Sequence, residues 1–380
     1  MAAQRKLRLG MVGGGRGAFI GAVHLIASRI DNNYELVAGA LSANPENARQ
    51  SAADLGIAPE RTYTDFREMA KAEARRKDGI DAVSIVTPNH VHFPAAKGFL
   101  EAGINVICDK PVTSTLEDAR ALAAIAKKSK AKFLLTHNYT GYPLMRQARA
   151  MVAAGELGKI RVVQAEYPQD WLTEAVSNKQ ADWRVDPKRS GAGGCIGDIG
   201  THAYNLARFV TGLPLAELSA DLTTFVKGRK LDDNVHIMLR FKGGARGMLW
   251  ASQVSPGNEN GLALRVYGEK GGLEWVQAEP NKMWFSPFGK PRQLITRGGA
   301  TPIGSEGNAA GAGVRIPPGH PEGYLEAFAT LYSDFAGVIR SGKGYDMLPS
   351  LADGVEGVEF ITAAVASSKA NGRWTKLSEV

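Results

Sequence analysis

The stretch GMVGGGRGA, residues 10–18, lies between an apolar run and a helix-like segment and decides the fold of the first part of the chain. It places Gly13, Gly15 and Ala18 at the G-x-G-x-x-G/A spacing of a dinucleotide-binding turn. The first glycine permits a tight bend, the second admits a pyrophosphate, and the third small residue keeps helix and strand close. The helix N-terminus adds N–H donors and a partial positive charge. Because a strand precedes the turn and a helix follows it, residues 10–18 are predicted to bind NAD or NADP.

Outward from this turn, short β-like runs alternate with helix-like segments over residues 7–136. Such alternation predicts parallel strands joined by crossover helices, that is, a doubly wound sheet with helices on both faces. The predicted strands are 7–12, 34–41, 82–86, 105–109 and 132–136, and the predicted helices are 19–30, 45–56, 65–77, 93–103 and 116–130.

The order of predicted elements changes in the second part of the chain. Closely spaced β-like runs between residues 218 and 296, separated by turn signals, predict a large, mostly antiparallel open sheet. The segment 297–323 is rich in Gly and Pro and is expected to be a long, mobile excursion. We therefore expect an α/β protein of two domains, 1–138 and 139–380. Further predicted elements are a helix over 144–158, a strand over 160–167, a helix that opens with Asp198, and two final helices over 324–342 and 354–372.

Composition narrows the function classes. The 380 residues are 44% hydrophobic and 22% charged, with no apolar run long enough to cross a bilayer. The N-terminal stretch leaves no room for a signal peptide, so we expect a cytoplasmic protein without a membrane partner. The net charge of +8 comes from scattered Lys and Arg, which argues against a nucleic-acid partner. Cys108 and Cys195 form neither a disulfide framework nor a zinc cage, and each is expected to be a small buried apolar residue.

The end of the second predicted strand bears on the choice of cofactor. An NAD-specific turn usually has a carboxylate there to hold the adenosine ribose, whereas this chain has Ser42 and no acid before Glu46. A hydroxyl accommodates a 2′-phosphate better than a carboxylate, which favours NADP or dual use, with Arg16 or Arg49 as candidate countercharges. Arginines at such positions are more often solvated surface residues, so NAD and NADP both stay open.

Two segments follow strands of the parallel sheet at the edge where ligands bind. They are TPNHVH, residues 87–92, and CDKPV, residues 108–112. The proline after Lys110 biases that lysine away from helix, so its ammonium can reach the nicotinamide edge. The alternative is that Lys110 is an ordinary solvent-facing loop residue.

The stretch GGCIGDIGTHAYN, residues 193–205, places Asp198 four residues before His202. On a helix these side chains share one face, where the carboxylate orients the imidazole or binds a common ligand. Alternatively, Asp198 caps a helix whose N3 position is about Thr201, and His202 is a partly buried core residue. A metal pair is a third option, but no further His or Cys has the spacing of a metal site.

Together, VGGGRGA, TPNHVH, CDKPV, WRVDPKRSGAGGCIGDIGTHAYNLARFV and ASSKANGRW resemble the Gfo/Idh/MocA family of sugar and cyclitol oxidoreductases. The resemblance covers essentially the whole chain, and the combination of motifs is far more specific than any one of them. It implies an NAD(P)-binding Rossmann domain over 1–138. It also implies an α/β domain over 139–380 that binds substrate and whose open sheet mediates homodimer or homotetramer formation.

The resemblance also implies roles for single residues. Lys110, Asp198 and His202 match the family's catalytic trio, which contacts the substrate. Asp109 stands where the family usually has Glu, and this shorter carboxylate changes its contact with the cofactor or with Lys110. By the same resemblance, Thr87, Pro88, Asn89 and His92 lie near the nicotinamide ribose, and Trp183 and Arg184 lie close to the substrate.

We therefore expect hydride transfer between nicotinamide and a secondary alcohol of a sugar, glycoside or cyclitol. A base with a pKa near neutrality suits removal of the hydroxyl proton, which assigns this step to His202. Asp198 would orient His202 or hold a neighbouring hydroxyl, and Lys110 would favour the developing alkoxide. Two rival functions fit the same motifs: an NAD-dependent glycoside hydrolase that acts by transient oxidation and elimination, and a non-catalytic nucleotide-sensing regulator.

Overall fold

The computed structural model describes residues 4–299 and 311–380. The chain forms two compact units, one of Met1–Thr136 with Phe328–Val355 and the other of His137–Ala327 with Glu356–Val380. The sequence pattern placed one boundary at 138/139 and did not indicate that the chain returns to the first unit. The apolar stripe of an amphipathic helix indicates that the helix packs against a core. It does not indicate which of the two sheets the helix covers.

The first unit contains a five-stranded sheet of order β2-β1-β3-β4-β5 in which every pairing is parallel. The predicted doubly wound sheet is therefore confirmed. All five residues of β3 are buried, as expected for a strand covered on both faces. Its elements are β1 (Leu7–Gly13), α1 (Phe19–Ile30), β2 (Tyr34–Ala40), α2 (Pro45–Asp54), α3 (Phe66–Arg75), β3 (Ala82–Val86), α4 (Asn89–Glu101), β4 (Asn105–Cys108), α5 (Leu116–Ala126) and β5 (Phe133–Leu135).

A buried polar cluster joins α1 and β3 to helix α10 (Tyr324–Ser341) within this unit. His24 Nδ1 lies 2.8 Å from the Tyr332 hydroxyl and 3.1 Å from Ser84 Oγ, and the two hydroxyls lie 2.8 Å apart. All three side chains are buried. Burial lowers the pKa of His24 to about 4, although the carboxylate of Asp109 opposes this shift.

This histidine should make the protein less stable in mild acid. In the unfolded chain His24 has its ordinary pKa of about 6.5 and is protonated below that pH. In the folded protein His24 stays neutral until the pH falls to about 4. The free energy of unfolding should therefore fall by up to about 3 kcal/mol as the pH drops through this window. In urea titrations followed by tryptophan fluorescence, His24→Asn should flatten the decline. The exposed control His320→Asn should keep the wild-type slope, and equal slopes in wild type and His24→Asn would contradict the expectation.

The second unit contains an eight-stranded sheet of order β13-β12-β11-β10-β6-β9-β8-β7. Its pairings are antiparallel except that of β6 with β9, so the predicted large and mostly antiparallel sheet is confirmed. Its strands are β6 (Ile160–Pro168), β7 (Leu215–Thr223), β8 (Asn234–Phe241), β9 (Arg246–Ser252), β10 (Ala263–Gly268), β11 (Gly271–Val276), β12 (Lys282–Pro287) and β13 (Gln293–Thr296).

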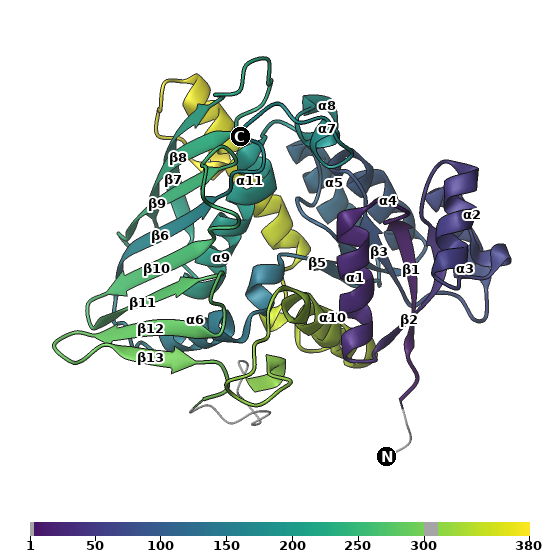
Figure 1. Ribbon diagram of the computed structural model, residues 1–380, viewed down its shortest axis with the longest axis horizontal. Helices are drawn as coiled ribbons and strands as arrows, with labels where there is room; N and C mark the ends of the chain where they lie inside the picture. The colour runs from purple at the N-terminus through teal and green to yellow at the C-terminus, as the bar shows by residue number, and fades with distance from the viewer. Residues whose placement is uncertain (1–3, 300–310) are drawn as a thin grey trace. The chain divides into compact units, whose positions relative to one another are not determined.

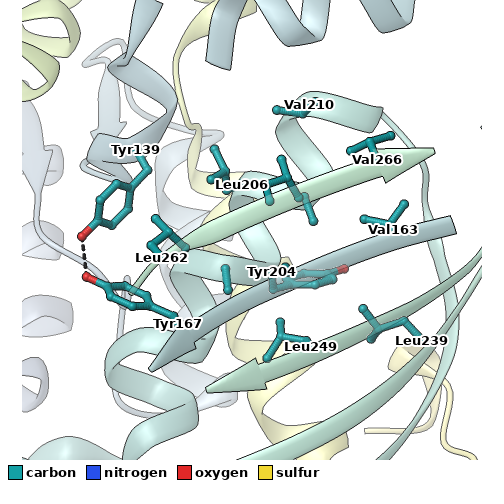
Figure 2. Packing of buried hydrophobic residues seen from close by; sticks show 14 of the residues in the cluster. Tyr139, Val163, Tyr167, Tyr204, Leu206, Val210, Leu239, Leu249, Leu262 and Val266 are labelled. Carbon is teal, nitrogen blue, oxygen red and sulfur yellow. Dashed lines mark hydrogen bonds between the residues drawn. The ribbon is translucent and has the colours of Figure 1, made fainter. Parts of the chain in front are cut away.

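Helices cover one face of this sheet and form the core of the unit. Figure 1 shows α6 (Pro143–Ala153) and α9 (Thr201–Thr211) on that face. Figure 2 shows Leu206 and Val210 of α9 over inward-facing residues such as Val163 and Leu249. The second part of the chain also contains helices α7 (Ala181–Arg184), α8 (Pro187–Ser190) and α11 (Leu351–Lys369).

The opposite face of the sheet carries exposed apolar side chains at alternate strand positions. Met238 of β8 and Met248 of β9 are cross-strand partners, and both are exposed. Val162 of β6 and Trp284 of β12 are also exposed. Exposed apolar side chains on one face of a sheet are candidates for an interaction surface. We call this set of four residues the outer apolar face.

The excursion predicted over 297–323 is described only in part, because residues 300–310 lie outside the described residues. Arg297 anchors the described portion. Its guanidinium donates to Asn281 Oδ1 at 2.8 Å and to the Ile316 carbonyl at 3.0 Å, and it lies 3.3 Å from the Glu322 carboxylate. Both charged side chains of this ion pair are buried.

Both cysteines are free and fully buried, as expected, and burial raises the pKa of each thiol. Among the helices of the described ranges 4–299 and 311–380, none combines the length and apolarity that a membrane span requires.

Candidate active site

The glycine-rich turn joins β1 to α1 with the geometry that a dinucleotide requires. Gly13, Gly14 and Gly17 have φ values of 81°, 75° and 76°, in the left-handed region that favours glycine. Ala18 is the N-cap residue of α1, and its side chain forms no hydrogen bond with the helix. An N-cap side chain therefore does not compete with a phosphate for the first N–H groups of α1.

Close backbone approaches explain two glycines around this turn. A Cβ atom on Gly15 would lie 2.7 Å from the Leu41 carbonyl oxygen, and one on Gly21 would lie 2.3 Å from Gly14 Cα. Gly21 thus makes the close contact between helix and turn that the sequence pattern assigned to Ala18. Because its glycines allow close approach and no side chain caps the helix that follows, the turn fits the pyrophosphate of a dinucleotide.

The candidate countercharges for a 2′-phosphate are paired with carboxylates. Arg16 Nε lies 2.6 Å from Asp54 Oδ2, and Arg49 forms an ion pair with Glu46. Ser42 follows β2, and its hydroxyl accepts a hydrogen bond from the Asn44 amide at 3.1 Å.

The TPNHVH segment lies beside the glycine-rich turn at the carboxyl edge of the parallel sheet. A Cβ atom on Gly13 would lie 2.8 Å from Thr87 Cγ2, so the two turns are in contact. Pro88 is the N-cap residue of α4, and buried Asn89 is its first residue. The helix begins four residues before the predicted start at 93, and Pro94 lies inside it.

His92 is fully buried, and both of its ring nitrogens face backbone carbonyls. Nδ1 lies 2.7 Å from the Pro111 oxygen and Nε2 lies 2.8 Å from the Thr87 oxygen. Burial lowers the pKa of His92, although these two carbonyls favour its protonated form. The ring therefore ties the turn after β3 to the turn after β4 through the main chain.

Lys110 follows β4, is partly buried and forms a cis peptide bond with Pro111. Asp109 accepts hydrogen bonds at Oδ1 from the Lys110 amide at 2.9 Å and from Thr136 Oγ1 at 3.0 Å. The shorter carboxylate thus holds the backbone of the turn that carries Lys110. Lys110 belongs to the first unit, whereas Asp198 and His202 belong to the second.

Asp198 lies in a π-helical turn, Ile196–Gly200, that leads directly into α9. The N-cap position of α9 is occupied by Gly200, so the alternative in which Asp198 caps the helix is wrong. Asp198 Oδ2 accepts hydrogen bonds from Arg184 Nε at 3.1 Å and from Gln253 Nε2 at 2.9 Å. Insertions of π-helix often occur at functional sites, where they re-aim side chains.

His202 lies in the first turn of α9 and is 8% exposed. Its ring lies edge-to-face with those of Tyr139 and His137, at centroid distances of 4.9 and 5.4 Å, and 6.3 Å from the ring of Tyr167. Figure 2 shows the hydroxyls of Tyr139 and Tyr167 hydrogen bonded to each other at the end of the core. Aromatic rings thus hold the His202 imidazole in a largely buried environment.

Trp183 and Arg184 were predicted to lie close to the substrate, and the structure places Arg184 against the Asp198 carboxylate. Trp183 and Arg184 lie on α7, with the Arg184 guanidinium 4.4 Å from the centroid of Trp183 and 5.8 Å from that of Trp171. Because Arg184 also binds Asp198, these residues form one cluster of charge and aromatic surface.

Several residues around this cluster were missed by the sequence reasoning. Gln253 holds Asp198, and His137 packs on His202. Tyr167 donates to Asn260 Oδ1 at 2.8 Å, and Asn260 in turn donates to Gln277 Oε1 at 2.7 Å. The local signal for these residues was weak: Gln253 directly follows β9, and Asn260 comes shortly before β10.

A glycine-rich turn between a parallel strand and an uncapped helix is typical of a dinucleotide-binding domain. Family models agree. Residues 7–137 match the oxidoreductase family with an NAD-binding Rossmann fold, and residues 145–274 match the GFO/IDH/MocA C-terminal domain. The chain belongs to the Gfo/Idh/MocA family of oxidoreductases, which confirms the resemblance.

Individual relatives match nearly the whole chain. The oxidoreductase YfiI of Bacillus subtilis is 33% identical, over 98% of this chain and 97% of its own length. The solved structure of an oxidoreductase from Sinorhizobium meliloti is 56% identical, with a TM-score of 0.90 and coverage of 98% and 100%. An inositol dehydrogenase homologue of Azotobacter vinelandii, solved with NADH and myo-inositol, is 37% identical, with a TM-score of 0.90 and coverage of 98% of each chain.

Proposed function

We propose that this protein is an NAD-dependent dehydrogenase that oxidises a secondary alcohol of a cyclitol, sugar or glycoside. The observation that carries the proposal is that one helical segment, residues 196–211, carries both a buried imidazole, His202, and a carboxylate, Asp198, that Arg184 and Gln253 hold in place. The relative solved with NADH and myo-inositol supports both the cofactor and the substrate class.

The roles of the residues follow from their chemistry. His202 accepts the hydroxyl proton, because imidazole is the side chain whose basicity best suits that transfer near neutral pH. Lys110 supplies a positive charge toward the developing alkoxide. Asp198 orients His202 or binds a neighbouring hydroxyl, and Arg184 holds it in place. Bound nicotinamide supplies the hydride acceptor.

Polar side chains beside His202 are suited to the remaining hydroxyls of a polyol. The chain of hydrogen bonds from Tyr139 through Tyr167 to Asn260 ends in groups that both donate and accept. Trp171, whose Nε1 donates to Gln169 at 3.0 Å, offers an aromatic face for stacking on a sugar or cyclitol ring. We propose that these residues, with Tyr142 and Asp170, bind the substrate.

The cofactor is proposed to be NAD rather than NADP. Arg16 and Arg49, the arginines suited to a 2′-phosphate, are already paired with Asp54 and Glu46. An added phosphate would therefore meet two carboxylates along with the two guanidinium groups. Residues 10–18 would hold the pyrophosphate. Thr87, Pro88, Asn89, Asp109 and Lys110 would lie at the nicotinamide end, with His92 fixing the backbone beneath them.

We propose further that residues 1–138 bind the cofactor and that residues 139–380 bind substrate and form a homodimer or homotetramer. The outer apolar face supports the second part, because two exposed methionines, a valine and a tryptophan favour burial against another copy of the chain.

A direct assay tests the proposed function. Purified protein is mixed with NAD⁺ or NADP⁺ and a panel of inositols, pyranoses and glycosides, and reduced-nicotinamide absorbance is followed. We expect NAD⁺-dependent oxidation of at least one polyol and weaker turnover with NADP⁺. Aryl-glycoside cleavage at catalytic NAD⁺ without net reduction would show a glycoside hydrolase instead. Nucleotide binding without any turnover, together with capture of a defined protein partner, would show a regulator.

A further inference from the structure

The carboxylate of Asp232 holds the segment that leads to Asp198. Its Oδ1 accepts a hydrogen bond from the Gly194 amide at 2.7 Å, and its Oδ2 accepts one from the Ile196 amide at 2.8 Å. The backbone carbonyl of Asp232 accepts a third from the Cys195 amide at 2.8 Å. Three consecutive amides, 194–196, therefore end on one buried residue.

This close approach explains Gly194, which lies two residues before the π-helical turn. A Cβ atom on Gly194 would lie 2.3 Å from the Asp232 carbonyl oxygen. The π-helical turn begins at Ile196, one of the residues whose amide Asp232 binds. The Asp198 amide donates to the Gly194 carbonyl at 2.9 Å. One backbone hydrogen bond therefore links Asp198 directly to the segment that Asp232 holds.

We propose that Asp232 is a positioning residue for the active site, which fixes residues 194–196 and thereby sets the place of Asp198 and His202. The proposal rests on the proposed function. Asp232 acts through the backbone, so it is not a catalytic residue. An error of about 1 Å in the position of a reacting group can cost roughly 100-fold in rate, which gives such a clamp a measurable effect.

The energetics of the buried carboxylate agree with a specialised role. Burial raises the pKa of Asp232 to about 6, and the amides of Ile196 and Gly194 oppose that shift by stabilising the ionised form. A buried carboxylate is costly unless donors satisfy it, and here the donors are the amides of the segment being held.

The neighbouring residue provides a matched control. Asp233 is also buried, and its carboxylate accepts hydrogen bonds from the amides of Phe225 at 2.9 Å and Val226 at 3.0 Å. It also pairs with Arg229 at 2.9 Å. Asp233→Asn therefore makes the same chemical change one residue away, on a carboxylate that holds a different loop.

The experiment compares Asp232→Asn with Asp233→Asn by hydrogen–deuterium exchange and by steady-state kinetics. In Asp232→Asn an NH₂ group faces a backbone donor, so the amides of residues 194–202 should exchange faster than in the wild type. The value of kcat should fall by up to about 100-fold, while the Kd for NAD⁺ stays unchanged. Asp233→Asn should lower the thermal midpoint, confine faster exchange to residues 225–229 and retain kcat.

If Asp232→Asn does not fold, Asp232→Glu retains both oxygens but moves them by one methylene, and it should show the same pattern. Wild-type exchange over residues 194–202 in these variants, or an equal fall of kcat in Asp232→Asn and Asp233→Asn, would overturn the proposal. A wild-type protein that binds NAD⁺ but oxidises no polyol would reject the proposed function, and the exchange data alone would then decide the role of Asp232.

Discussion

His202→Asn should lower kcat by about 10²- to 10⁴-fold, the range that a positioned general base contributes. Asn keeps a polar side chain of similar reach but cannot accept and release the hydroxyl proton near neutral pH. The Kd for NAD⁺ should stay at the wild-type value, because His202 and the glycine-rich turn lie in different units. Stopped-flow and steady-state measurements of reduced-nicotinamide absorbance, with fluorescence titration of NAD⁺, check both expectations.

The exposed variant His320→Asn is the control for this change, and it should retain full turnover. Wild-type turnover in His202→Asn would remove this residue from the role of base. A loss of NAD⁺ binding together with turnover would show instead that the variant had disturbed the fold.

Lys110→Met should lower kcat/KM by about 10²- to 10³-fold, since a single well-placed electrostatic donor at a developing oxyanion contributes an effect of that size. Met keeps the length of the side chain and removes the charge. A second expected result is diagnostic: the acidic limb of the kcat/KM profile should move to higher pH. If Lys110 and His202 act on the same hydroxyl, as proposed, removing the positive charge makes it easier to protonate the imidazole, so a higher pH is needed to keep His202 in its basic form.

Measurement of kcat/KM against pH for wild type, Lys110→Met and Lys110→Arg checks this expectation. Lys110→Arg should restore the position of the acidic limb but only part of the rate, because a guanidinium keeps the charge and changes the geometry. If the limb does not move in Lys110→Met, the ammonium does not act on the same hydroxyl as His202.

Local sequence was sufficient where a local rule sets the structure. Helix α1 begins and ends at the residues predicted, because the glycine-rich turn precedes it and its apolar periodicity is regular. The alternation of strands and helices also predicted the parallel sheet. By contrast, the start of α4 was misplaced, since the predicted helix over 93–103 omitted residues 89–92, which form its first turn.

The surroundings of the candidate site could not be predicted in the same way. Asp198 was recognisable from its motif, but its partner Gln253 is 55 residues away and Asp232 is 38 residues from Gly194. The pairing of β8 with β9 in one register is what places Gln253 and Asp233 side by side, with the Gln253 amide 2.8 Å from the Asp233 carbonyl. Register depends on the packed sheet as a whole, so a motif cannot report it.

The return of Phe328–Val355 to the first unit has a practical consequence for anyone dissecting the protein. A gene fragment ending at residue 138 would omit Tyr332, and with it the hydroxyl that satisfies His24 and Ser84 in the interior. It would also lose the Pro349 carbonyl that receives the Leu135 amide on the last parallel strand. Such a fragment should be prone to aggregation, whereas a version with residues 328–355 fused back through a flexible linker would retain these interior bonds.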